Sequence, residues 1–169
     1  MHHRQLTVLS TLLVLAAGLA LAAELPKRKP GLWEMTLSSP DSKRPPRSAR
    51  YCIDAATEAL LDDFAGGTSR KNCSKDVTHA EGDHFVVESV CTVDKSQVTG
   101  HTVITAHGDS SFHMEIHSHF DPPMYGPADV DTIQDSRWIG ACPADMQPGD
   151  MVTATGVKMN LKDVAKASP

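Results

Sequence analysis

The fold class is decided by residues 96–120, which read SQVTGHTVITAHGDSSFHMEIHSHF. Apolar and polar side chains alternate on both sides of Gly108-Asp109-Ser110, which is the pattern of two half-buried strands joined by a turn. The apolar sets of the two strands share a face only if the loop has an odd number of residues, as these three do. We therefore expect an antiparallel hairpin in which His101 lies opposite His117.

The same register collects polar side chains on the other face of the hairpin. Thr99 then lies opposite His119, and Val103 lies opposite Glu115. Five potential metal ligands share this face: His101, His113, Glu115, His117 and His119. Imidazoles on opposed strand positions are close enough to converge on an ion such as zinc, copper or nickel. The alternative is that these histidines form the solvated face of a half-buried sheet and bind no metal.

Four cysteines flank this hairpin in the sequence. Cys52, Cys73 and Cys91 precede it, and Cys142 follows it. Four cysteines allow three pairings. Residues 72–80 and 84–94 are expected to be strands around a turn centred on Gly82, which places Val77 opposite Val87 and Cys73 opposite Cys91. Cys52 then pairs with Cys142. A redox or metal role is the alternative, but the chain has no C-x-x-C motif.

The remaining elements complete a mainly β chain. Residues 31–37 alternate so that Trp33 is on the buried face, and 130–142 and 151–159 are further expected strands. Asp54 caps a helix over 55–64, whose predicted apolar stripe is Ala56, Leu60 and Phe64. These elements predict a curved antiparallel meander or half-open β-barrel of about six to seven strands with one short helix. A two-layer α+β sheet is the alternative.

The amino-terminal residues predict the domain organisation and the compartment. Residues 1–23 have a charged start, an apolar run and an A-x-A at Ala20 and Ala22, as in a cleaved signal peptide. We expect a solvated basic arm at 24–30, one disulfide-bridged domain at 31–160 and a loose tail at 161–169. The mature protein should be periplasmic or secreted, with no membrane-spanning segment after cleavage.

Charge and motif content exclude several classes of function. The chain has 16 Lys and Arg against 21 Asp and Glu, a net charge of −5, which disfavours nucleic acid as a partner. It contains no G-x-S-x-G nucleophile motif and no phosphate-binding glycine motif. We therefore assign no catalytic residue.

Two motifs carry a resemblance to a known group of proteins. The chain has K-P-G-L-W-E at Lys29–Glu34 and R-W-I-G-A-C-P at Arg137–Pro143. In these it resembles an exported bacterial family that is catalogued as a domain of unknown function. The resemblance implies a periplasmic, cysteine-bridged, mostly β domain, and it implies no activity.

These observations predict a non-enzymatic binding domain for a small apolar ligand or an envelope protein. The residues expected to line a concave ligand site are Trp33, Phe112, Met114, Ile116 and Phe120. The alternative for these residues is a filled core. The alternative function is a metal-binding protein or metal-dependent hydrolase that uses the histidine-rich face.

Overall fold

The computed structural model describes residues 24–63, 70–124 and 126–167, and the expected signal peptide and Phe64 lie outside them. Nine strands form one antiparallel sheet in the order β3-β4-β5-β6-β7-β1-β2-β8-β9. Their bounds are Gly31–Ser38 (β1), Arg47–Ile53 (β2), Cys73–Glu81 (β3), His84–Val93 (β4), Ser96–His107 (β5), Ser111–Asp121 (β6), Asp129–Gly140 (β7), Asp150–Thr153 (β8) and Lys158–Asn160 (β9). The mainly β fold class is confirmed, but the predicted six to seven strands are too few. The difference arises because β2 is a full strand paired with β1, and because residues 151–159 fold back on themselves as β8 and β9.

The β5–β6 hairpin has the predicted register. His101 pairs with His117, Thr99 with His119 and Val103 with Glu115. Both strands therefore keep their apolar side chains on one face, as the alternation requires.

The β3–β4 hairpin departs from its predicted register near the turn. Glu81 pairs with His84, so Gly82 and Asp83 form a two-residue connection, and Val77 lies opposite Glu88 instead of Val87. An irregularity between Cys73 and Lys75 shifts the register back by one residue. Cys73 consequently lies opposite Cys91, as predicted.

The two cysteine pairs are at disulfide distance, in the pairing expected from the sequence. Their Cα atoms are 5.7 Å apart for Cys52–Cys142 and 3.8 Å apart for Cys73–Cys91. The first pair connects β2 to the segment after β7, and the second joins neighbouring strands at the edge of the sheet.

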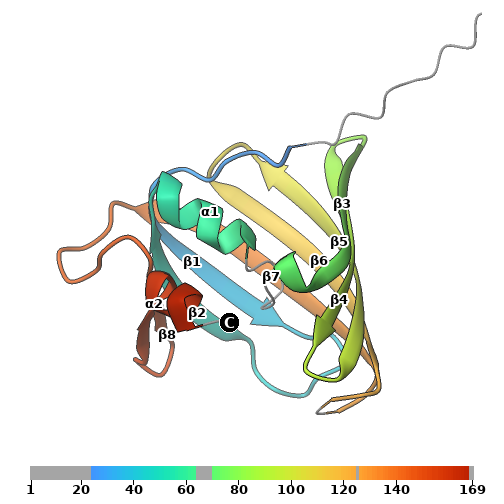
Figure 1. Cartoon of the computed structure of the whole chain (residues 1–169). Coiled ribbons are helices and arrows are strands. Elements are labelled where there is room, and N and C mark those ends of the chain that lie inside the picture. Colours follow the sequence, from blue (N-terminus) through green and yellow to red (C-terminus); the bar gives the residue numbers. More distant parts are fainter. Residues whose placement is uncertain (1–23, 64–69, 125, 168–169) are drawn as a thin grey trace, which may run out of the picture.

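The core lies on the concave face of the sheet, which Figure 1 shows crossed by helix α1 (Ala55–Asp63). Trp33 is fully buried at its centre. The Trp33 ring is stacked with the Tyr51 ring, with 6.3 Å between the ring centroids. It is tilted relative to the Phe112 ring, with 5.8 Å between the centroids. Aromatic pairs at these separations contribute packing beyond their buried area.

Asp54 caps α1 as predicted. Its carboxylate accepts from the backbone N–H of Thr57 at 2.9 Å, and the Thr57 hydroxyl accepts from the Asp54 N–H at 2.8 Å. The predicted apolar stripe is wrong at Ala56, which is exposed, whereas Leu60 is half-buried. Thr57 and Glu58 are buried instead, and Leu61 packs against the core. The capping threonine is fully buried, so a partly polar side of the helix faces inward.

The tail, which was predicted to be loose, contains a helix. Leu161–Ala167 form helix α2, and Leu161 is buried. Asp150, itself buried, holds this end together by accepting from Gln147 N, Lys158 Nζ and Asn160 Nδ2, each at 2.8 Å. The Gln147 N–H bond is the main reason that the pKa of Asp150 falls to about 2.

No helix in the described part of the chain is long and apolar enough to span a membrane.

The two cysteine pairs should differ in how strongly they stabilise the fold. They span 90 and 18 residues, and in the chain-entropy treatment the longer loop contributes about 4–5 kcal/mol and the shorter about 3 kcal/mol. We predict that Cys52→Ala with Cys142→Ala lowers the free energy of unfolding by about 1–2 kcal/mol more than Cys73→Ala with Cys91→Ala. Urea unfolding of the two double variants measures the difference, and an equal or smaller loss for the Cys52–Cys142 pair contradicts it.

Candidate functional site

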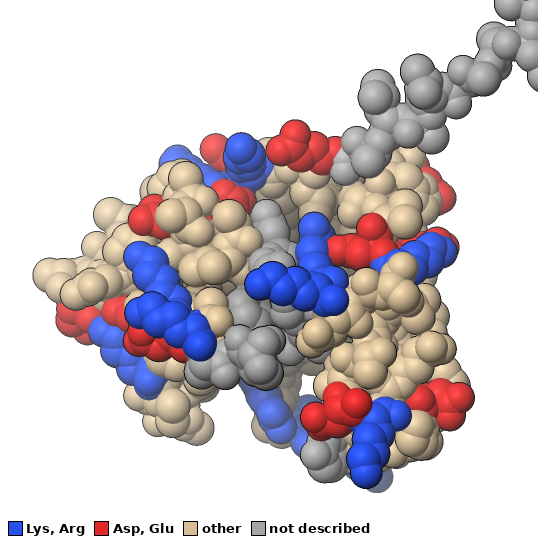
Figure 2. Space-filling view, in the orientation of Figure 1, with Lys and Arg blue, Asp and Glu red and all other residues tan. Residues whose placement is uncertain are grey.

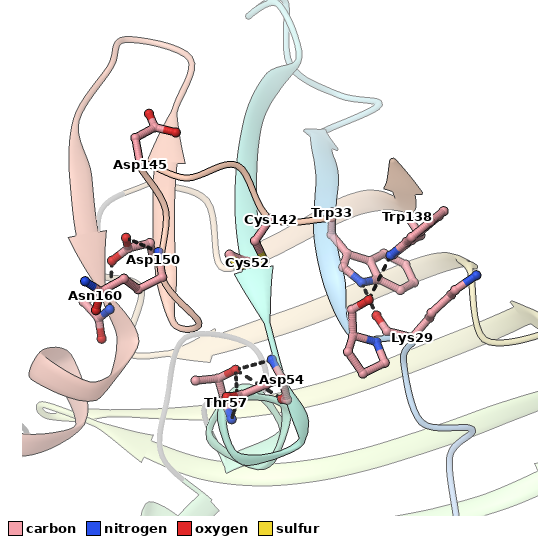
Figure 3. The surroundings of a disulfide bond; sticks show 12 residues. Lys29, Trp33, Cys52, Asp54, Thr57, Trp138, Cys142, Asp145, Asp150 and Asn160 are labelled. Atoms are coloured by element: carbon pink, nitrogen blue, oxygen red, sulfur yellow. Dashed lines mark hydrogen bonds between the residues drawn. A yellow bond between two sulfur atoms is a disulfide. The ribbon is translucent and has the colours of Figure 1, made fainter. Parts of the chain in front are cut away.

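Residues 24–30, which we call the arm, run along the rim of the concave face from the start of β1 toward β3 (Figure 1). Both tryptophans bond to its backbone: Trp33 Nε1 donates to the Lys29 carbonyl at 2.8 Å, and Trp138 Nε1 donates to the Pro30 carbonyl at 3.1 Å. Figure 3 shows both indoles directed at this backbone. The Lys29 N–H in turn donates to the Asp109 carbonyl at 2.8 Å. Lys29 and Pro30 are exposed, as predicted for a solvated arm, but their backbone is also fastened to the sheet.

Gly31 makes this fastening sterically allowed. Its φ of +133° is a conformation that side chains with a Cβ rarely adopt. A Cβ here would also overlap the Gly140 carbonyl oxygen and Trp138 Nε1. The start of β1 can therefore approach the end of β7 closely only because residue 31 is glycine.

An ion pair joins the arm to α1. The Arg28 backbone N–H donates to the Glu58 carboxylate, and Arg28 Nη1 lies 3.7 Å from Glu58 Oε1. The guanidinium carbon sits 5.3 Å from the centroid of the Phe112 ring, within cation–π range. The two side chains are only 16% and 10% exposed. Burial also raises the pKa of the nearby Tyr51 hydroxyl, whose partner is Ser136, so Tyr51 is neutral at physiological pH.

A cavity of about 280 Å³ lies between the arm, α1 and the inner face of the sheet. Its apolar lining comes from Leu25 and Pro26 of the arm and from Ile104, Phe112 and Met114 of the sheet. Its polar lining comes from both sides of the opening: Glu24, Lys27, Arg28, Glu58, Arg70 and Thr78. The cavity thus has an apolar floor and a charged rim.

The cavity contains two of the five predicted ligand-lining residues. Phe112 and Met114 line it, whereas Trp33 is fully buried in the core. Ile116 and Phe120 lie further along β6, outside this cavity. Sequence reasoning missed Ile104, although the predicted register already placed it opposite Met114. It also missed Arg28 and Glu58, because no periodicity links an irregular arm to a buried polar helix position.

The predicted metal ligands occupy the outer face of the sheet. His101, Glu115 and His117 line a shallow groove of about 530 Å³ there. Each of three histidines on β6 bonds to a carboxylate on β7: His113 to Asp135 at 2.7 Å, and His117 to Asp131 and His119 to Asp129 at 2.8 Å. These pairs turn the rings toward β7 instead of toward a common point. Two further contacts are longer: His113 Nε2 lies 3.5 Å from Glu115 Oε1, and His117 Nε2 lies 3.7 Å from Asp129 Oδ1. Within the described residues, no three His, Cys, Asp or Glu side chains form a group that could hold a metal ion.

The carboxylates change the titration of this face. The hydrogen bond to Asp135 raises the pKa of His113 above its usual 6.5, and the bond to Asp131 does the same for His117. Because the folded-state pKa is raised, each pair stabilises the protein below about pH 6.5. That contribution is lost as the pH rises through the raised pKa.

The face of the molecule that contains the cavity has mixed charge. Figure 2 shows Lys and Arg next to Asp and Glu over the described part of this face. Arg70 Nε, at the cavity rim, lies 2.8 Å from Asp76 Oδ2. Neighbouring charges of opposite sign leave no strong field to attract an ion of one sign.

The paired histidines give a site-specific prediction. Asp135→Asn should lower the pKa of His113 toward 6.5 and leave the titration of His117 in place, since the carboxylates that act on His117 are Asp131 and Asp129. Asp131→Asn should lower the pKa of His117 and leave the titration of His113 in place. Histidine ring ¹H–¹⁵N spectra recorded against pH measure both values, and unchanged titration of the partnered histidine in either variant contradicts the pairing.

Comparison with known proteins identifies the family. A family model described as "Protein of unknown function (DUF3617)" matches residues 28–142, from the end of the arm to the last cysteine. Lys29–Glu34 and Arg137–Cys142, the stretches that carried the resemblance, fall within this range. No curated protein and no solved structure matches the chain. Because the match covers well over half of its length, the chain belongs to this family of proteins of unknown function.

Proposed function

We propose that this protein is a non-enzymatic binding domain that holds a small, mostly apolar ligand in the concave cavity. The observation that carries the proposal is the cavity itself, where the arm covers Ile104, Phe112 and Met114. Apolar side chains line one part of the cavity and polar side chains line the rest, and small-molecule sites use both kinds of group.

The cavity limits the size of the ligand. Sites for drug-sized molecules have volumes of about 300–1,000 Å³. At about 280 Å³ this cavity is just below that range, so the small apolar ligand that we propose is smaller than a drug-sized molecule. Beside the cavity, the Trp33–Phe112 contact and the buried Tyr51 belong to the core.

We place this activity outside the cytoplasm. The cysteine pairs at disulfide distance are compatible with an exported protein, and the sequence of residues 1–23 favours export. Docking of an envelope protein has less support. The exposed large apolar side chains of the described residues are Val77, Val157, Met159 and Val164, which is a small set compared with the contiguous patch of a docking surface.

Filling the cavity should abolish binding. We use hexan-1-ol as the probe and Met114→Trp as the variant, because the larger side chain occupies the space between the arm and β6. Saturable shifts of the Met and Ile methyl NMR signals report binding to the wild type. We predict that Met114→Trp weakens binding at least about tenfold, which corresponds to about 1.4 kcal/mol.

His117→Trp is the matched control, since it places the same side chain on the outer face of the same strand. It should bind the probe like the wild type. Met114→Phe serves as a milder filling variant if the tryptophan destabilises the core, and circular dichroism melting checks folding. Equal binding by folded Met114 variants and wild type, or an absence of saturable binding to the wild type, overturns the proposed function.

A further inference from the structure

The polar end of the cavity indicates what kind of ligand it accepts. This inference rests on the proposed function. We propose that the cavity selects small uncharged amphiphiles whose head group both donates and accepts hydrogen bonds, such as a hydroxyl or a primary amide. The residues that make the selection are Arg28 and Glu58.

Arg28 and Glu58 form a buried pair of opposite charge inside the site. Both line the cavity, and the Glu58 side chain is only 10% exposed. A buried charge is costly unless it is paired and hydrogen-bonded. A ligand that brings a further charge next to these two side chains must place that charge in a poorly solvated part of the molecule.

The pair offers both kinds of hydrogen-bonding group to a ligand. A guanidinium has five N–H donors, and a carboxylate has about four acceptor positions. The Arg28 backbone N–H uses the Glu58 carboxylate as its acceptor, which fixes the carboxylate relative to the arm. A hydroxyl or amide can accept from the arginine and donate to the glutamate, whereas a carboxylate can only accept and an ammonium can only donate.

The remaining charges at the rim do not favour either sign. Lys27 and Arg70 are cationic, Glu24 is anionic, and Arg70 is paired with Asp76. An anion near Arg28 would also be near Glu58, and a cation near Glu58 would be near Arg28. A neutral head group avoids both repulsions and leaves its apolar body against Phe112 and Met114.

A head-group series tests the inference on the wild-type protein. The probes are hexan-1-ol, hexanamide, hexanoate and hexylamine at pH 7, which share one apolar chain, and methyl NMR titration measures each affinity. We expect the alcohol and the amide to bind at least about tenfold more tightly than either ion. Binding of hexanoate or hexylammonium as tightly as hexan-1-ol overturns the inference.

Two variants should shift the preference of the cavity, one toward an anionic head group and the other toward a cationic one. Glu58→Gln keeps an oxygen for the Arg28 N–H but removes the negative charge, so hexanoate should gain affinity relative to hexan-1-ol. Arg28→Met keeps an apolar stem over Phe112 but removes the positive charge, so hexylammonium should gain. If either variant fails to fold by circular dichroism, the wild-type series still decides the question.

The outcomes separate this inference from the proposed function. If all four probes bind equally well and Met114→Trp abolishes their binding, the cavity is the site but its polar end does not select, and the inference is wrong. If none of the probes binds the wild type, the proposed function is wrong and the inference fails with it.

Discussion

The burial of the Trp33 indole is the interaction on which the rest of the structure depends. The ring is fully buried between Tyr51 and Phe112, so it fills the centre of the concave face. Its Nε1 also donates to the Lys29 carbonyl and so positions the arm. One side chain therefore packs the core and fastens the segment that covers the cavity. β1 is suited to this because it lies in the interior of the sheet, between β7 and β2.

The two motifs that carry the family resemblance lie side by side in space. β1 pairs with β7 so that Glu34 lies opposite Arg137 and Trp33 opposite Trp138. Arg137 Nε donates to the Glu34 carboxylate at 3.1 Å, which is the main cause of the lowered pKa of Glu34. Lys29 Nζ lies 4.1 Å from the centroid of the Trp138 ring. Each motif therefore supplies partners for the other, which gives a physical reason for both to occur in one chain. Together they join the start of β1 to the end of β7, where the arm is fastened.

The parts of the fold that follow a strict two-residue period could be predicted from the sequence, and the parts set by irregular backbone could not. Alternation fixed the β5–β6 register, whereas the bulge near Ser74 shifted the β3–β4 register without a periodic signal. The His–Asp pairs were predictable in principle, because Asp129, Asp131 and Asp135 alternate along β7 in the way that the histidines alternate along β6. The arm and the buried Glu58 could not be foreseen, since their positions depend on the tertiary contacts of two tryptophans and a capped helix.

The proposed function depends on the fastened arm, which lines the cavity together with the concave face. The most direct test is an isotope-filtered nuclear Overhauser experiment on the wild-type protein with bound hexan-1-ol. We expect contacts from the terminal methyl of the alcohol to the Met114 and Ile104 methyl groups, which line the apolar part of the cavity. Contacts confined to Val103 and Ile133, which line the groove on the outer face, would contradict it.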